Sequence, residues 1–200
     1  MPKLVDHDER RRAIVAAAWR VIATRGIDGT NMRDLAREAG YANGALSHYF
    51  SGKDEILRAA YDHVFTATND RVARVVADDT GLVALRKFCH EVMPLTSETL
   101  LEARIAVSLW QRGLNDEHMA QTNQRALAEW RLAITDYLRQ AQDEGTVADL
   151  DVAVAAEHLM TTLVGMQVTG ALDPDAATPA SMVAVIDAIL ASWARRLESL

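Results

Sequence analysis

Proline is almost absent from this sequence, and its four prolines are Pro2, Pro94, Pro174 and Pro179. The stretches between them are rich in Ala, Leu, Arg and Glu, which favour helices, whereas proline is the residue that interrupts a helix most strongly. Half of the 200 residues are apolar, which is enough to bury a core. The chain is therefore predicted to be all-α, with about nine helices.

The cysteine content and the hydropathy of the chain indicate the cellular compartment in which the protein is expected. The single cysteine, Cys89, cannot form an internal disulfide, and no leader-like segment precedes a small-residue cleavage site. The longest early apolar run, residues 13–19, has seven residues and is too short to span a membrane. We expect a cytoplasmic protein with no membrane segment.

Charge is distributed unevenly along the chain. Residues 1–60 carry ten Lys and Arg against eight Asp and Glu, a net charge of +2, whereas residues 61–200 have a net charge of −9. The positive end favours contact with phosphates, while the acidic remainder discourages indiscriminate binding to polyanions.

The first fifty residues divide into three predicted helices. The first spans about residues 8–26, the second is Asn31–Ala39 with Thr30 as its N-cap, and the third is Ala42–Tyr49, with Gly40 in the turn before it. Two short helices joined by a glycine-containing turn are typical of a helix-turn-helix, in which the second helix enters the major groove. An ordinary helical hairpin would give the same pattern.

Later helices are marked by their ends. Ser51 and Asp54 are predicted to form a capping box that opens a long helix to about Asp78. Three further helices are predicted to end near Pro94, Gly113 and Gly145.

The last two predicted helices are unusually apolar. From His158 to Leu172 no charged residue occurs, and a helix that is apolar nearly all round is buried all round. Leu159, Leu163 and Met166 are predicted to face the core of the chain itself. The final helix starts at Thr178 and Pro179. A homodimer is predicted, with an interface formed by Met160, Val164, Val168, Ile186, Ile189 and Trp193.

The segment Thr30–Leu57, TNMRDLAREAGYANGALSHYFSGKDEIL, resembles the DNA-binding signature of the TetR family of transcriptional regulators. Most members carry Tyr at the position of Ser47, and in having Ser there the chain resembles the BetI-like subgroup. The segment Leu163–Met182 also resembles the closing segment of that subgroup. The resemblance covers nearly all of the chain. It implies a repressor that binds DNA as a dimer and is released by a small molecule, of which a choline-like inducer is one candidate.

This resemblance also implies a division of labour. Residues 1–52 are expected to be a three-helix DNA-binding domain of the helix-turn-helix type. Residues 53–200 are expected to be a larger helical domain for effector binding and dimerisation.

The outward residues of the third helix are the predicted DNA contacts. Asn43 suits adenine N6 and N7, and Ala42 suits a thymine methyl group. Thr30 and Lys53 lie at helix starts, where backbone N–H groups favour phosphate. The predicted DNA-binding set is Thr30, Arg33, Tyr41, Ala42, Asn43, Gly44, Ser47, His48 and Lys53. The alternative is that these residues form an ordinary exposed polar surface.

A second set of residues is predicted for the effector. A quaternary ammonium group would favour an aromatic cage, with a carboxylate such as Glu102 or Glu157. The predicted ligand-binding set is Phe65, Phe88, Trp110, Trp130, Tyr137 and Glu157. For each aromatic residue, core packing is the alternative role.

An enzyme and a purely helical interaction module are the competing interpretations. The sequence has no G-x-S-x-G, P-loop, G-x-G-x-x-G or H-E-x-x-H motif, and its six histidines lack metal-ligand spacing. No catalytic residue, metal or cofactor is therefore predicted. An interaction module would explain the dimer face but not the Thr30–Lys53 signature. The expected partners are a double-stranded DNA operator, a small-molecule inducer and a second copy of the chain, while activation of transcription and a tetramer stay open.

Overall fold

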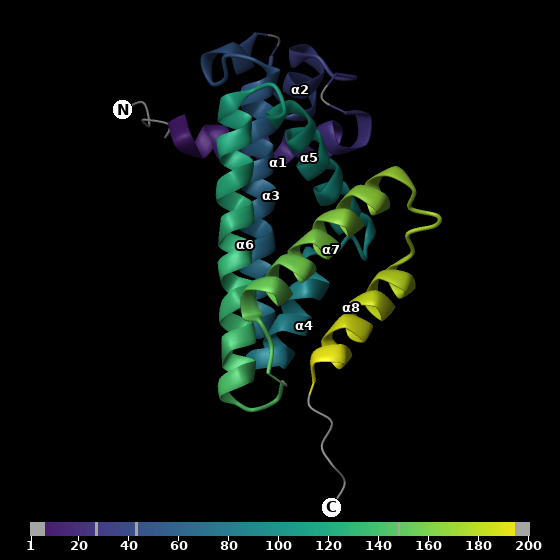
Figure 1. Cartoon of the computed structure of the whole chain (residues 1–200). Coiled ribbons are helices and arrows are strands. Elements are labelled where there is room, and N and C mark those ends of the chain that lie inside the picture. The colour runs from purple at the N-terminus through teal and green to yellow at the C-terminus, as the bar shows by residue number, and fades with distance from the viewer. Residues whose placement is uncertain (1–6, 27, 43, 148, 195–200) are drawn as a thin grey trace, which may run out of the picture. The chain divides into compact units, whose positions relative to one another are not determined.

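The computed structural model describes residues 7–26, 28–42, 44–147 and 149–194. In these ranges the regular elements are eight α-helices and one 3₁₀ helix, with a single isolated β-bridge between Val147 and Ala194. The prediction of an all-α chain with about nine helices is thus confirmed. The elements, labelled in Figure 1, are α1 His7–Arg25, α2 Met32–Glu38, η1 Ala45–His48, α3 Lys53–Val76, α4 Gly81–Val92, α5 Ser97–Gly113, α6 Glu117–Asp143, α7 Val152–Leu172 and α8 Pro179–Trp193.

Side-chain caps fix the starts of the last two helices. The Asp151 carboxylate accepts hydrogen bonds from the backbone N–H groups of Ala153 and Val154, at 3.0 and 3.1 Å, at the start of α7. Thr178 Oγ1 accepts from the N–H of Ser181 at 3.2 Å, and proline follows at the first position of α8. Each cap satisfies N–H groups that have no partner inside the helix. The predicted start of the final helix is confirmed.

The chain forms two compact units. Unit 1 contains the described residues up to Ala67 together with Arg104–Asn123, and unit 2 contains Thr68–Ala103 together with the described residues from Gln124 onward. Helices α3, α5 and α6 therefore contribute residues to both units. The functional division between residues 52 and 53 stays a prediction.

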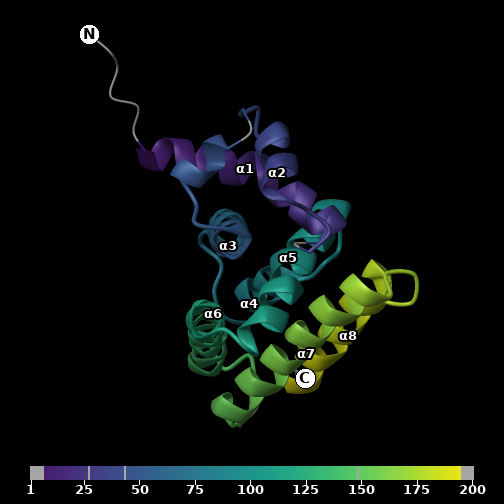
Figure 2. The same cartoon turned by 90° about the horizontal axis from the view of Figure 1, so that it is seen from above.

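Unit 1 is built around the first three elements. Helix α1 packs against α2, and α2 packs against η1, as the view from above in Figure 2 also shows for α1 and α2. The core has aliphatic and aromatic side chains that are almost fully buried: Ile14, Trp19, Ile22, Leu35, Leu46, Phe50, Ile56 and Leu57. Burying one such side chain contributes roughly 1.5–3 kcal/mol to stability.

Unit 2 is held together by α4, α7 and α8. Helix α4 packs against α8, while α7 and α8 lie side by side in both views, with the rings of His158 and Trp193 6.0 Å apart (Figures 1 and 2). The buried Gln167 donates a hydrogen bond to the carbonyl of Val92 at 3.1 Å, linking α7 to the end of α4. The prediction that Leu159, Leu163 and Met166 face the core is confirmed.

Two further features belong to this description. Cys89 on α4 is buried, and its burial raises the pKa of the thiol far above the usual range. Across the described residues, none of the helices combines the length and the apolar character needed to cross a membrane.

Candidate nucleic-acid interface

Helix α2 begins with a side-chain cap one residue later than predicted. Asn31 Oδ1 accepts a hydrogen bond from the backbone N–H of Asp34 at 2.9 Å, so Asn31 is the N-cap and the prediction of Thr30 is wrong. Thr30 is 3% exposed, and its hydroxyl donates to the carbonyl of Gly26 at 3.3 Å. The Thr30 side chain therefore stabilises the loop from inside unit 1 and is too buried to touch DNA.

The turn after α2 depends on glycine. Gly40 has a φ of +74°, in the left-handed region that side chains with a Cβ rarely adopt. The N–H groups of Gly40 and Tyr41 then donate to the carbonyls of Arg37 and Ala36 at 3.1 and 2.8 Å. These bonds satisfy the last carbonyls of the helix and redirect the chain into the next element.

The third element is shorter and tighter than predicted. A helix over Ala42–Tyr49 was expected, but the structure has the 3₁₀ helix η1 over Ala45–His48. Gly44 has a φ of +86°, which lies outside right-handed helix geometry and so stops the helix from starting earlier. The N–H groups of Ser47 and Tyr49 donate to the carbonyls three residues before them, at 3.2 and 2.9 Å.

Small and polar residues are exposed on η1 and in the turn before it. Ala42, Gly44, Ser47 and His48 are exposed, and Tyr41 is half-buried. Asn43, the predicted adenine contact, lies outside the described residues. Ser47 Oγ donates to the carbonyl of Gly44 at 2.6 Å, so its lone pairs stay available to an incoming donor.

Helix α1 holds the far end of η1. His7 Nε2 lies 3.3 Å from the carbonyl oxygen of His48, and Arg11 donates to the carbonyl of Tyr49. The Arg11 guanidinium also lies 4.3 Å from the centre of the Phe50 ring and donates to Glu55 Oε1 at 2.9 Å. Because a short 3₁₀ helix has few internal bonds, these contacts fix its orientation.

Glu55 also closes the loop before α3. Its Oε2 accepts from the N–H and the hydroxyl of Ser51 at 2.7 and 2.8 Å, so the predicted Ser51–Asp54 capping box is wrong and Glu55 takes that role. The hydrogen bond from the Ser51 N–H is the main reason that the pKa of Glu55 lies below its usual value, and Arg11 lowers it further.

Cationic side chains surround the exposed residues. Arg10 donates to the hydroxyl of Tyr41 at 3.4 Å, a bond that raises the pKa of Arg10. Arg33 is exposed on α2, and Lys53 Nζ donates to the Thr30 carbonyl at 3.0 Å. Exposed donors and small side chains on a fixed element, flanked by fixed cations, are suited to base edges and phosphates. The sequence does not predict that His7 and Arg11 support η1, because their partners are distant from them in the sequence.

The predicted effector residues do not all fall in one unit. Phe88, Trp130 and Tyr137 lie together in unit 2, with ring centres 6.0 Å apart for Phe88 and Trp130 and 6.1 Å for Phe88 and Tyr137. Phe65 and Trp110 belong to unit 1, where the Phe65 ring stacks on Tyr61 at 6.1 Å. Trp110 Nε1 is buried with no hydrogen-bond partner among the described residues.

Both carboxylates considered for the effector are already paired. Glu157 is exposed and binds Arg131 at 2.9 Å, which lowers its pKa. Glu102 is buried and accepts from Arg71 Nη1 and Nη2 at 2.8 and 2.6 Å, while Glu91 binds Arg71 Nε at 3.2 Å. Neither Glu102 nor Glu157 is free to balance a cationic ligand in this state.

The predicted dimer residues divide into exposed and buried sets. Val164, Val168, Ile189 and Trp193 are partly exposed on α7 and α8. Met160 and Ile186 are instead 2% and 0% exposed, because the core of unit 2 covers them. These two have no surface to offer a partner and are corrected to core residues. The same two helices expose three other apolar side chains, Val154, Leu172 and Val185.

Two family models match the chain. Residues 14–60 match the model of bacterial regulatory proteins of the tetR family, and residues 83–195 match the model of the C-terminal part of BetI-type transcriptional repressors. The first match contains α2, η1 and the start of α3. The second contains most of the remaining helices.

Individual proteins are similar over most of their length. The chain is 32% identical to the HTH-type transcriptional regulator PksA of Bacillus subtilis over 177 residues, which cover 87% of this chain and 84% of PksA. It is 25% identical to the HTH-type transcriptional regulator BetI 2 of Chromohalobacter salexigens over 181 residues, covering 88% and 84%. A Saccharomonospora viridis protein solved in complex with choline superposes with a TM-score of 0.88 at 21% identity, covering 94% of this chain and 100% of that one, which supports the fold.

Proposed function

The chain belongs to the TetR family of transcriptional regulators and has a BetI-type C-terminal region, and on that basis we propose that it is a dimeric repressor released from a palindromic operator by a small-molecule inducer. DNA recognition is assigned to residues 1–52. Effector binding and dimerisation are assigned to residues 53–200.

The fixed and exposed η1 segment is the observation that supports DNA recognition most directly. His7 and Arg11 hold its carbonyl end, and Gly40 sets its angle to α2. Ser47 and His48 face outward and are assigned to base edges or phosphates. Arg33, Tyr41, Ala42, Gly44 and Lys53 are assigned to the same surface, together with Asn43 as the adenine contact.

The apolar exposure of α7 and α8 supports the proposal of a dimer. Val164, Val168, Ile189 and Trp193 are assigned to the interface, and the exposed Val154, Leu172 and Val185 enlarge the apolar area available on these helices. Two identical subunits related by a two-fold axis read two half-sites, so the operator is expected to be palindromic.

Selection of duplexes from a random library tests this function. The purified chain should enrich a two-fold-symmetric sequence and should elute as a dimer in size-exclusion chromatography with light scattering. Recovery of no sequence, or of an asymmetric site bound by a monomer, would contradict the proposal. Reporter expression from a promoter that carries the selected site then distinguishes repression from activation.

Variants separate base reading from phosphate binding. Asn43→Ala should relax the preference at one position per half-site, because one bidentate base contact discriminates by about 1–3 kcal/mol. Lys53→Ala should weaken binding on all sequences because a cation is lost, and should weaken operator binding further because the bond to the Thr30 carbonyl is also lost. If Asn43→Ala lowers affinity uniformly, the assignment of Asn43 as a base reader is wrong.

Induction is assigned to a ligand that binds better when the two recognition elements of the dimer are at a spacing that no longer matches the two half-sites of the operator. Binding of this ligand would therefore lower the affinity for DNA. Coupling of about 1–3 kcal/mol is enough to change DNA affinity from several-fold to a hundredfold. Choline is the first compound to test, since it is bound by the similar Saccharomonospora viridis protein. Trp130 and Tyr137 are the aromatic residues assigned to its ammonium, and the Phe88 ring, which is 1% exposed, packs against both of them as a core residue.

Tryptophan fluorescence during a choline titration tests the inducer. The tryptophan emission of the wild-type chain should change as choline is added, and that of the Trp130→Phe variant should not. The operator complex should dissociate over the same range of choline concentration. An unchanged spectrum and an intact complex would exclude choline as the inducer. Such a result would leave the DNA-binding assignment in place.

A further inference from the structure

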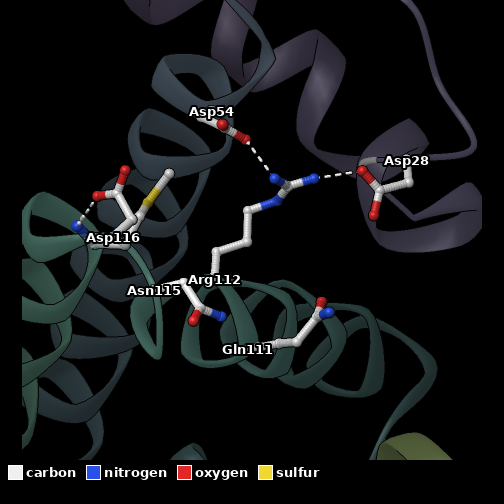
Figure 3. Close-up of a pocket in the computed structure, with 7 residues that line it drawn as sticks. Asp28, Asp54, Gln111, Arg112, Asn115 and Asp116 are labelled. Carbon is white, nitrogen blue, oxygen red and sulfur yellow. Dashed lines mark hydrogen bonds and ion pairs between the residues drawn. The ribbon is translucent and has the colours of Figure 1, made fainter.

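Arg112, at the end of α5, joins two segments that lie far from it in sequence. Its Nη2 donates to Asp28 Oδ1 in the loop between α1 and α2, and its Nη1 lies 3.1 Å from Asp54 Oδ1 in the first turn of α3 (Figure 3). All three residues belong to unit 1. The Arg112 side chain is 26% exposed, and its buried Nε has no hydrogen-bond partner among the described residues. Its polar contacts are therefore made by the two terminal nitrogens.

The segments that Arg112 joins are those that set the start of α2. The loop containing Asp28 leads to Thr30, whose carbonyl accepts from Lys53 Nζ at 3.0 Å, and to Asn31, the N-cap of α2. Lys53 and Asp54 are adjacent at the start of α3. Two cations, Lys53 and Arg112, thus tie the same loop to the same helix start.

We propose that Arg112 is a positioning residue for DNA recognition: it fixes the loop before α2 and the start of α3, and so sets the angle of the helix-turn-helix without touching DNA. This inference rests on the proposed DNA binding. Arg112 lies 84 residues from Asp28, outside the 14–60 segment matched as the DNA-binding region. The region that reads DNA therefore depends on a side chain from the end of α5.

One substitution, Asp28→Asn, should change DNA affinity in opposite directions according to whether the cluster positions the helix-turn-helix or acts only through its charge. Asp28→Asn removes a negative charge from the DNA-binding unit, so a purely electrostatic role for this cluster predicts tighter binding to any duplex. The positioning role predicts weaker binding to the operator, because the ion pair that holds the loop is lost. The two explanations therefore predict opposite signs.

The test measures the affinity of the full chain for its selected operator and for a random duplex of equal length at one salt concentration. Asp28→Asn and Arg112→Gln should each weaken operator binding, by about twofold to fivefold given the modest strength of partly exposed ion pairs. Arg112→Lys should recover most of the loss. Asp28→Asn should leave binding to the random duplex unchanged or slightly tighter. Beside the guanidinium lies a cavity of about 390 Å³ lined by Gln111, Asn115, Asp116 and Met119, so the shorter replacements meet no obstruction.

A matched control is available in unit 2. Arg86 forms an ion pair with Asp187 at 2.7 Å, so Arg86→Gln removes the same charge and a similar bond but should not change operator affinity. Operator binding by Asp28→Asn that equals or exceeds that of the wild type would overturn the proposal, as would an equal loss in Arg86→Gln. If Arg112→Gln unfolds, Asp28→Asn decides alone. Failure of the wild-type chain to bind any operator would instead contradict the proposed function.

Discussion

Replacing Gly44 by alanine tests the conformation of the DNA-reading segment. The sequence predicts a continuous helix from Ala42 to Tyr49, whereas the structure has Gly44 at a φ of +86° before the shorter η1. Alanine stabilises a helix interior but strains a left-handed residue. Gly44→Ala therefore changes stability in opposite directions for the two conformations.

The magnitude follows from the surroundings of Gly44. A Cβ added there would have no atom within 4 Å, so no steric clash contributes and the whole cost is backbone strain. That strain is about 1–2 kcal/mol for an alanine in the left-handed region. In a continuous helix the same substitution would instead gain roughly 1 kcal/mol. The two outcomes differ by about 2–3 kcal/mol, which is well above the error of a denaturation measurement.

The assay is urea unfolding of the full chain at one protein concentration, since dimerisation would make stability depend on concentration. Gly40→Ala serves as the matched control, because Gly40 has a φ of +74° and also has no atom within 4 Å of an added Cβ. Both variants should lose about 1–2 kcal/mol. A Gly44→Ala protein that is more stable than the wild type, while Gly40→Ala is less stable, would refute the left-handed conformation of Gly44.

Three further substitutions follow from contacts described above. Asn31→Ala should lower the free energy of unfolding by about 1 kcal/mol, because the N–H of Asp34 loses its acceptor, while Asn31→Asp should retain most of it; equal losses in urea would exclude the cap. The lowered pKa of Glu55 means that its contribution is present above the unfolded pKa and is lost as pH falls through the folded pKa. Glu55→Gln should therefore reduce the dependence of stability on pH below about pH 5, and an unchanged profile from pH titrations of unfolding would contradict this. Phe88→Ala should cost about 3–5 kcal/mol because the ring is 1% exposed, and a loss below about 1 kcal/mol in thermal unfolding would show that it is not a core residue.

Local signals were sufficient to predict most of the helices, but not the 3₁₀ helix η1 and not every cap. The long proline-free stretches and the break at Pro94 predict the elements, and Thr178 begins the last helix as expected. At the start of α2 two adjacent residues, Thr30 and Asn31, are both suitable caps. Burial decides between them, since Thr30 is used inside the loop and Asn31 remains to bind the Asp34 N–H.

Contacts between distant residues explain most of what the sequence did not predict. Nothing near Arg112 in the sequence indicates that it forms an ion pair with Asp28. In the same way, nothing near Glu102 indicates that its carboxylate is paired with Arg71. Met160 and Ile186 fit an interface by periodicity. Whether such residues are covered by their own subunit depends on the packing of neighbouring helices, which periodicity does not specify.

The burial of Cys89 makes it a natural reporter of transient opening in unit 2. Its thiol is shielded by α4 and its neighbours and is protonated at neutral pH, so an alkylating reagent can reach it only when the surrounding helices separate. The rate of modification thus measures how often that region opens. A compound that binds and rigidifies unit 2 would slow the reaction, so candidate inducers can be compared by labelling rate without any DNA in the assay.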